Sequence, residues 1–78
     1  MCEVIGIRQV SFKNNQGQTI SGVTVYFTKQ EYKVDGLAAD KAFVSTQLME
    51  RAVWEPEIGD HFEPLYNKYG KLTDVRLE

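Results

Sequence analysis

The clearest hydrophobic pattern in the chain is a strict alternation over residues 19–28. Val23, Val25 and Phe27 fall on one face of an extended segment, whereas Tyr26 belongs to the opposite face. Successive side chains of a strand point to opposite faces, so this period of two predicts a half-buried β-strand. We expect the valine face to pack into a core and the tyrosine face to be exposed or to meet a ligand.

The segment before it, residues 3–13, is rich in β-branched and aromatic residues and has no helical period. It therefore predicts a first strand, joined to the second by an Asn- and Gly-rich turn over residues 14–18. Its apolar positions shift from odd numbers, such as Ile7, to even numbers, such as Val10. A bulge or strong bend near Arg8 and Gln9 would explain the shift.

The second half of the chain predicts four shorter elements separated by Gly, Asn and Pro. In chain order these are a strand over 41–44, a helix capped by Ser45 or Thr46 and ending near Ala52 or Val53, a strand over 61–66, and a strand over 71–77. Pro64 cannot donate a backbone hydrogen bond, so we expect an edge or a bulge at that position. Among the phenylalanines, Phe27, Phe43 and Phe62 fit core positions, as does Trp54.

This element order predicts the fold class. Five strands with a short helix between the third and the fourth make an all-β protein with a small α component, arranged as a five-stranded OB-type barrel. An SH3-like barrel with a helical insert is the alternative. The 78 residues are enough for a single OB-like domain, 1–78, and too few for two.

Composition excludes several kinds of stabilisation and targeting. Cys2 is the single cysteine and His61 the single histidine, so neither an intrachain disulfide nor a zinc site is expected. A domain this small often gains stability by self-association, which favours a homodimer. No apolar run is long enough to span a membrane, and the N-terminus lacks a signal pattern, so we expect a cytoplasmic protein.

Residues for catalysis are also lacking. His61 has no partners that suggest a catalytic triad, and the acidic residues near it lack the spacing of a calcium loop. The glycines are scattered singly and make no phosphate-binding loop. We therefore expect no enzymatic activity, no cofactor and no small-molecule substrate.

Charge is distributed unevenly along the chain, although the formal net charge is only -2. Residues 1–34 carry four basic and two acidic side chains, residues 35–63 two basic and seven acidic, and residues 64–78 three basic and two acidic. An acidic middle segment thus separates two mildly basic ends. A fold that brought both ends to one face would create a basic surface.

Two short segments interleave aromatic and basic residues: 29–33 and 66–71. Proteins that bind single-stranded nucleic acid use this combination, because aromatic rings stack on bases while lysine and arginine contact phosphates. Nine of the 78 residues are aromatic, and the four tyrosines lie outside the predicted core. This pattern favours a binding module.

Residues 58–72, a Gly-started strand followed by a Tyr-rich hairpin, resemble the gene V-like, helix-destabilising single-stranded-DNA-binding proteins of filamentous phages and related mobile elements. The resemblance implies an OB-fold homodimer that coats single-stranded DNA, or alternatively RNA, without sequence specificity during DNA replication. It also implies which residues contact the ligand. Those residues are Arg8, Lys13, Tyr26, Lys29, Tyr32, Lys33, Tyr66, Lys68, Tyr69 and Lys71.

A second hypothesis is a protein-interaction barrel that serves as an accessory subunit of a phage or mobile-element assembly. The acidic net charge agrees with it. It predicts an exposed apolar patch around Trp54, Pro56 and Ile58.

Overall fold

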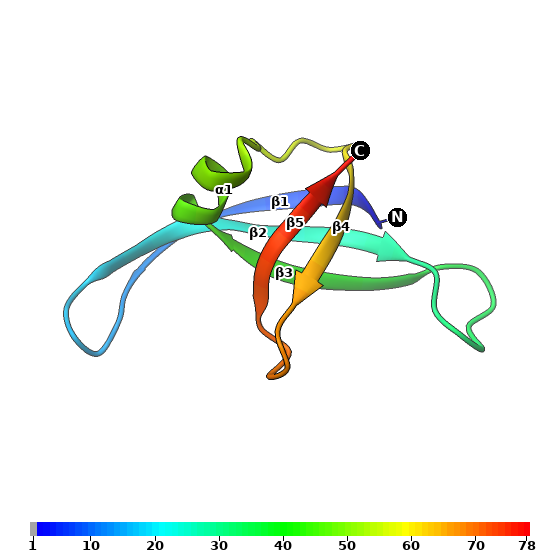
Figure 1. Ribbon diagram of the computed structural model, residues 1–78, viewed down its shortest axis with the longest axis horizontal. Coiled ribbons are helices and arrows are strands. Elements are labelled where there is room, and N and C mark those ends of the chain that lie inside the picture. Colours follow the sequence, from blue (N-terminus) through cyan, green and yellow to red (C-terminus); the bar gives the residue numbers. More distant parts are fainter. Residues whose placement is uncertain (1) are drawn as a thin grey trace.

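Five antiparallel strands and one short helix make up the computed structural model, which describes residues 2–78 (Figure 1). The elements are β1 (Cys2–Lys13), β2 (Thr19–Lys29), β3 (Ala38–Ser45), α1 (Thr46–Ala52), β4 (His61–Tyr66) and β5 (Leu72–Leu77). The predicted order of three strands, a helix and two strands is confirmed. The third strand is longer than predicted, because residues 38–40 also pair with β2.

The strands form one sheet in the order β3-β2-β1-β4-β5. β2 pairs along most of its length with both β1 and β3. Within residues 2–78, β4 joins β1 through the pairs Cys2–Phe62 and Glu3–His61, and it then pairs with β5. Pro64 thus lies where β4 has a partner on one side only, as its missing N–H requires.

β3 and β5, the two ends of this order, approach each other without pairing, so the sheet is not closed into a barrel. β4 and β5 cross the other three strands at a steep angle and make a second layer over them (Figure 1). We call the space between β3 and β5 the seam. No backbone ladder spans it within residues 2–78.

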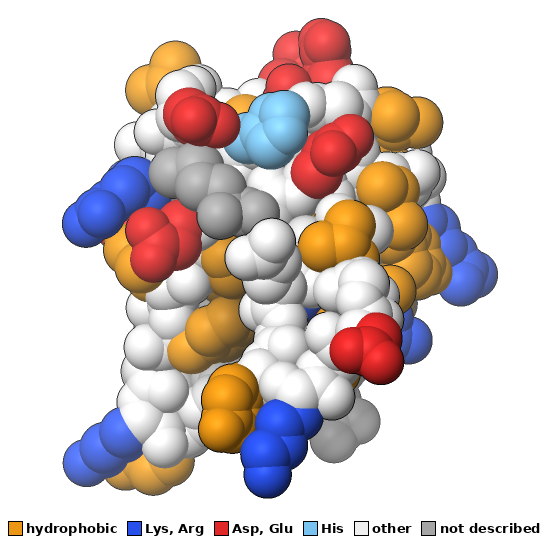
Figure 2. Space-filling model, turned by 90° about the vertical axis from the view of Figure 1, so that its right-hand side faces the viewer, with side chains coloured by type: hydrophobic (Ala, Val, Ile, Leu, Met, Phe, Trp, Pro, Cys, Tyr) orange, Lys and Arg blue, Asp and Glu red, His pale blue; other side chains and the backbone are white. Residues whose placement is uncertain are grey.

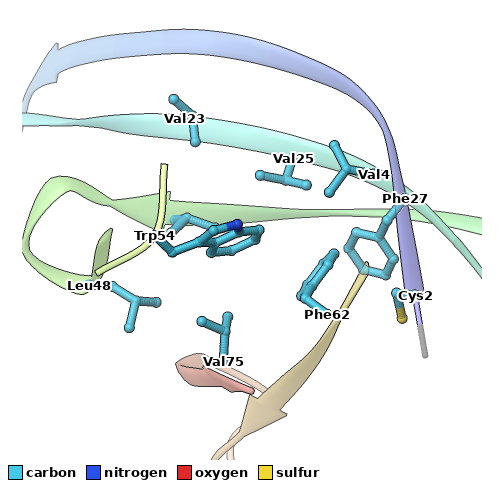
Figure 3. Packing of buried hydrophobic residues seen from close by; sticks show 10 residues of the cluster. Cys2, Val4, Val23, Val25, Phe27, Leu48, Trp54, Phe62 and Val75 are labelled. Atoms are coloured by element: carbon cyan, nitrogen blue, oxygen red, sulfur yellow. The ribbon is translucent and has the colours of Figure 1, made fainter. Parts of the chain in front are cut away.

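The core fills the space between the two layers (Figure 3). Phe62 of β4 lies at its centre, with ring centroids 5.2 Å from Phe27 and 5.1 Å from Trp54. The Trp54 indole N–H donates to the carboxylate of Asp60 at 3.1 Å, so its one polar group is satisfied. The predicted core positions of Phe27, Phe62 and Trp54 are confirmed.

Two expectations about apolar residues are wrong. Phe43 is not in the core: Val44 takes the buried position in β3, so its neighbour points to the opposite face. The exposed apolar patch is not formed as predicted either, because Trp54 and Pro56 are buried and only Ile58 is exposed.

The irregularity in β1 also lies elsewhere than predicted. The register with β2 shifts between Val4 and Gly6, so Ile5 is the extra residue and its side chain is exposed. No shift occurs at Arg8 or Gln9. The apolar change of phase between Ile7 and Val10 involves no bulge: Ile7 lies opposite the buried Val25 and packs against the core, whereas Val10 and Phe12 lie on the other face of the strand.

The helix agrees with its sequence signals. The Ser45 side chain accepts a hydrogen bond from the Leu48 backbone N–H at 3.1 Å, which caps the helix start. Val53 ends the helix in a left-handed conformation, rare for a β-branched residue, and its N–H bonds back to the last turn. Within residues 2–78, no helix is long and apolar enough to cross a membrane.

Candidate nucleic-acid interface

The outer face of β1, β2 and β3 gathers polar, basic and aromatic side chains. Thr24 of β2 lies opposite Arg8 of β1 and Phe43 of β3, and Tyr26 lies opposite Lys41. Directly opposed residues of antiparallel strands project to the same side of the sheet. Since Val23, Val25 and Phe27 occupy the core side, this row faces outward.

Glycines let the two outward rings lie close to the sheet. A Cβ built on Gly6 would meet the Tyr26 ring at 3.5 Å, and one built on Gly22 would meet the Phe43 ring at 2.9 Å. Each ring thus covers a glycine of the neighbouring strand. Phe43 also packs against Phe12 of β1, with ring centroids 6.2 Å apart. These contacts restrict both rings before any ligand arrives.

This face is hollowed into a groove of about 560 Å³, which we call the sheet groove. Its walls include Arg8 and Val10 of β1, Thr24 and Tyr26 of β2, and Lys41 and Phe43 of β3.

A second groove, of about 680 Å³, occupies the seam, and we call it the seam groove. Arg51 of α1, Tyr66 at the end of β4, and Lys71 and Thr73 of the β4–β5 hairpin line it, together with β3. Lys41 and Phe43 belong to both grooves, so the two make one continuous surface.

Charge separates this surface from the rest of the molecule. Four of the nine basic side chains line it, and none of the eleven acidic ones does. The four are Arg8, Lys41, Arg51 and Lys71. Among residues 2–78, none of these four forms an ion pair with a carboxylate. An acidic protein thus carries a concentrated, uncompensated positive surface.

Elsewhere some basic groups lie near carboxylates, whereas Lys13, Lys33 and Lys68 have no ion pair within residues 2–78. His61 lies 3.9 Å from Glu3, and Arg76 lies 3.6 Å from Glu63. Figure 2 shows acidic side chains around the histidine in the upper part of one face, with Lys and Arg toward its sides and lower edge. We call the group formed by Glu3, His61, Glu63 and Arg76 the acidic end.

Lys29 is similarly neutralised. Its ammonium lies 3.2 Å from the carboxylate of Asp40, which raises the pKa of Lys29. The backbone N–H of Lys41 and the Lys29 ammonium together hold the pKa of Asp40 below its ordinary value. The Lys29 charge is therefore less available to a ligand than that of the groove cations.

Of the ten residues expected to contact nucleic acid, the structure brings four together in the two grooves: Arg8, Tyr26, Tyr66 and Lys71. Burial raises the pKa of Tyr66, which agrees with a ring set into the wall of the seam groove.

The other predicted contacts are dispersed. Lys13 ends β1 at one extremity of the long axis, and the β2–β3 loop with Tyr32 and Lys33 lies at the other (Figure 1). Lys68 and Tyr69 occupy the tip of the β4–β5 hairpin. Both tyrosines are exposed, by 88% and 80%, and each ring has its neighbouring lysine over it, at 5.6 Å and 5.1 Å.

Three residues that line the grooves were not predicted from the sequence to contact a ligand: Lys41, Phe43 and Arg51. The two basic ones lie in the acidic middle segment, whose net charge concealed them. Strand alternation could have revealed Lys41 and Phe43, because both share the parity opposite to Val44. Nothing local marks Arg51, since its place beside the seam depends on tertiary packing.

The part of the chain that the structure describes holds no group of three His, Cys, Asp or Glu side chains placed to bind a metal ion. Comparison of the chain with family models, with curated proteins and with solved structures finds no match.

Proposed function

We propose that this protein is an OB-type module that binds single-stranded nucleic acid, DNA in the first place, on the surface formed by the sheet groove and the seam groove. One observation carries the proposal: four unpaired cations and three aromatic rings line a surface free of carboxylates on an acidic protein. The rings are Tyr26, Phe43 and Tyr66.

Each part of this surface has a role in the proposed complex. The cations contact successive phosphates and release counterions, and the rings stack on bases, at about 1–3 kcal/mol per base. The proposed contacts are to phosphates and to the faces of bases, which every nucleotide presents, so binding is tolerant of sequence. An unstacked strand exposes base faces that a duplex does not, so single strands are preferred.

The finer architecture belongs to the same proposal. A helix between β3 and β4, and a ligand surface on β1, β2 and β3, agree with an OB-type arrangement whose seam is left open. The homodimer rests on the small size of the domain and on the resemblance of residues 58–72. The role in replicating phage or mobile-element DNA rests on that resemblance alone.

The test is a titration with fluorescent oligo-dT of about 30 nucleotides, long enough for several OB-type sites. Tyrosine fluorescence provides a second signal, and a duplex of equal length is the control. We expect micromolar or tighter binding to the single strand, weaker binding to the duplex, and a slope of about -3 in log K against log salt if all four cations contact phosphate. Absence of binding at low salt, or equal affinity for the duplex, would refute the proposal.

A further inference from the structure

The seam groove has a different construction from the sheet groove. Its two walls are the outer edges of β3 and β5, and neither edge has a strand partner there. Edge strands expose unpaired backbone N–H and C=O groups. Side chains satisfy part of these edges, since the Lys41 backbone N–H donates to the Asp40 carboxylate and the Thr73 carbonyl accepts from Arg51. Side chains from α1 and from the β4–β5 hairpin complete the groove.

Arg51 is held in place beside this groove. Its guanidinium donates a hydrogen bond to the backbone carbonyl of Thr73, which links α1 to β5 across the seam. A guanidinium has five N–H donors, so this bond leaves others free. The structure thus fixes a cation at the groove and keeps part of its hydrogen-bonding capacity available.

The opposite wall is also restrained. The Asn67 side chain accepts hydrogen bonds from the backbone N–H groups of Tyr69, at 2.9 Å, and Lys71, at 3.0 Å. These bonds hold the hairpin turn that places Lys71 at the groove. Tyr66, immediately before the turn, adds a partly exposed ring to the same wall.

We propose that the seam groove is a separate nucleotide subsite, in which Arg51 and Lys71 contact a phosphate and Tyr66 stacks on a base of a strand that continues from the sheet groove. This inference rests on the proposed function. The volume of about 680 Å³ suits a nucleotide, since pockets for small ligands span about 300–1,000 Å³.

Two observations favour a nucleotide over an extended peptide paired to the open edges. The groove holds cations and no carboxylate, which matches a polyanion. Lys41 and Phe43 join it to the sheet groove, so one strand can occupy both without leaving the surface. A peptide has no comparable reason to follow that path.

Oligonucleotide length tests the subsite. An oligo-dT of about 4 nucleotides, at the lower end of OB-type site sizes, should occupy the sheet groove alone, whereas one of about 12 should occupy both grooves. We expect Lys71→Gln and Arg51→Gln each to weaken binding of the longer oligomer about tenfold, the effect of one lost charged hydrogen bond, and binding of the shorter one less than about twofold. Lys68→Gln, on the same hairpin and outside the groove, is the matched control and should change neither.

Arg51→Gln also removes the bond to Thr73, so Arg51→Lys is added, which keeps the charge and should lose less affinity. Hydrogen exchange gives an independent measure: the longer oligomer should slow exchange in residues 41–45 and 71–73, and the shorter should not slow it in 71–73. If Lys71→Gln and Arg51→Gln leave both affinities unchanged while Arg8→Gln weakens both, the subsite is wrong and the proposed function stands. If the wild-type protein binds neither oligomer, the proposed function itself fails.

Discussion

The surface formed by the sheet groove and the seam groove lies on the same small sheet as the acidic end. The two regions differ in whether their basic side chains are paired with carboxylates. At the acidic end His61 lies beside Glu3, and the Arg76 guanidinium is paired with the carboxylate of Glu63. In the grooves the basic groups have no such partners. Exposed ion pairs contribute little to stability, and uncompensated cations on one surface repel one another. The contrast supports the proposal that the groove cations serve a ligand, in which case a net charge of -2 is a poor guide to what this protein binds.

We expect the largest loss of affinity when a charge is reversed where the two grooves meet. Lys41 lines both, so Lys41→Glu places a carboxylate among Arg8, Arg51 and Lys71. We expect affinity for oligo-dT to fall about a hundredfold or more at low salt, because a phosphate contact becomes a repulsion. Fluorescence anisotropy measures the change.

Lys33→Glu is the matched control, since it makes the same charge change on the β2–β3 loop. It should weaken binding by only a few fold, through screened long-range effects. Equal losses in the two variants would mean that overall charge, and not the grooves, determines binding.

The next largest loss of affinity is expected when an aromatic ring is removed. Tyr26→Ala or Phe43→Ala should weaken binding about tenfold or more, since each stacked base is worth about 1–3 kcal/mol. Tyr69→Ala, at a hairpin tip and 80% exposed, should cost less than about twofold. A larger effect at Tyr69 than at Tyr26 would move the stacking site to the hairpin. Thermal melts show whether loss of the contact between Phe43 and Phe12 affects folding.

The two glycines that the Tyr26 and Phe43 rings cover provide a third prediction. A Cβ on Gly22 would lie 2.3 Å from the backbone oxygen of Val44, whereas one on Gly6 would meet only the Tyr26 ring at 3.5 Å or more. We expect Gly22→Ala to lower the free energy of unfolding by about 1–3 kcal/mol and Gly6→Ala to change it by less than about 0.5 kcal/mol. Urea denaturation compares them, and equal stabilities would contradict the close approach of β2 and β3.

The smallest effect concerns the neutralised Lys29. Since the pKa of Asp40 is lower in the folded protein, this carboxylate stabilises the fold above its unfolded-state pKa and ceases to do so as pH falls through its folded-state pKa. The group is exposed, so Asp40→Asn should cost no more than about 0.5 kcal/mol at pH 7. The difference from wild type should disappear in acid, below the folded-state pKa. A difference that persists there would assign the effect to something other than the charge.

Local patterns predicted most of the fold. Alternation identified β2, and the capping serine together with the apolar spacing identified α1. Local patterns failed where pairing with neighbouring strands determines which side chains of a strand face the core. The bulge in β1 is at Ile5, beside a two-residue pairing with β4 that local sequence does not reveal. Phe43 was assigned to the wrong face because only part of β3 was recognised.

The candidate site was harder to predict than the fold. Alternation predicted that Tyr26 lies on the non-core face of β2, whereas Arg8 was expected to contact a ligand only through the resemblance. The pairing of β1 with β2 brings both to one face. Tyr32 and Tyr69 matched the composition of a binding site, yet loops carried them to separate extremities. Arg51 joins the surface only because α1 packs beside β5, a contact between segments far apart in sequence.

Mapping of oligo-dT binding by nuclear magnetic resonance tests the central claim most directly, because the 8.9 kDa chain allows every backbone amide to be followed. The account predicts that the largest shift changes on titration fall in residues 8–11, 24–26 and 41–43, with further changes in 71–73, while His61, Glu63 and their neighbours at the acidic end stay unchanged. Changes confined to the loop tips around Tyr32 or Tyr69, changes centred on His61, or no changes at low salt would contradict it.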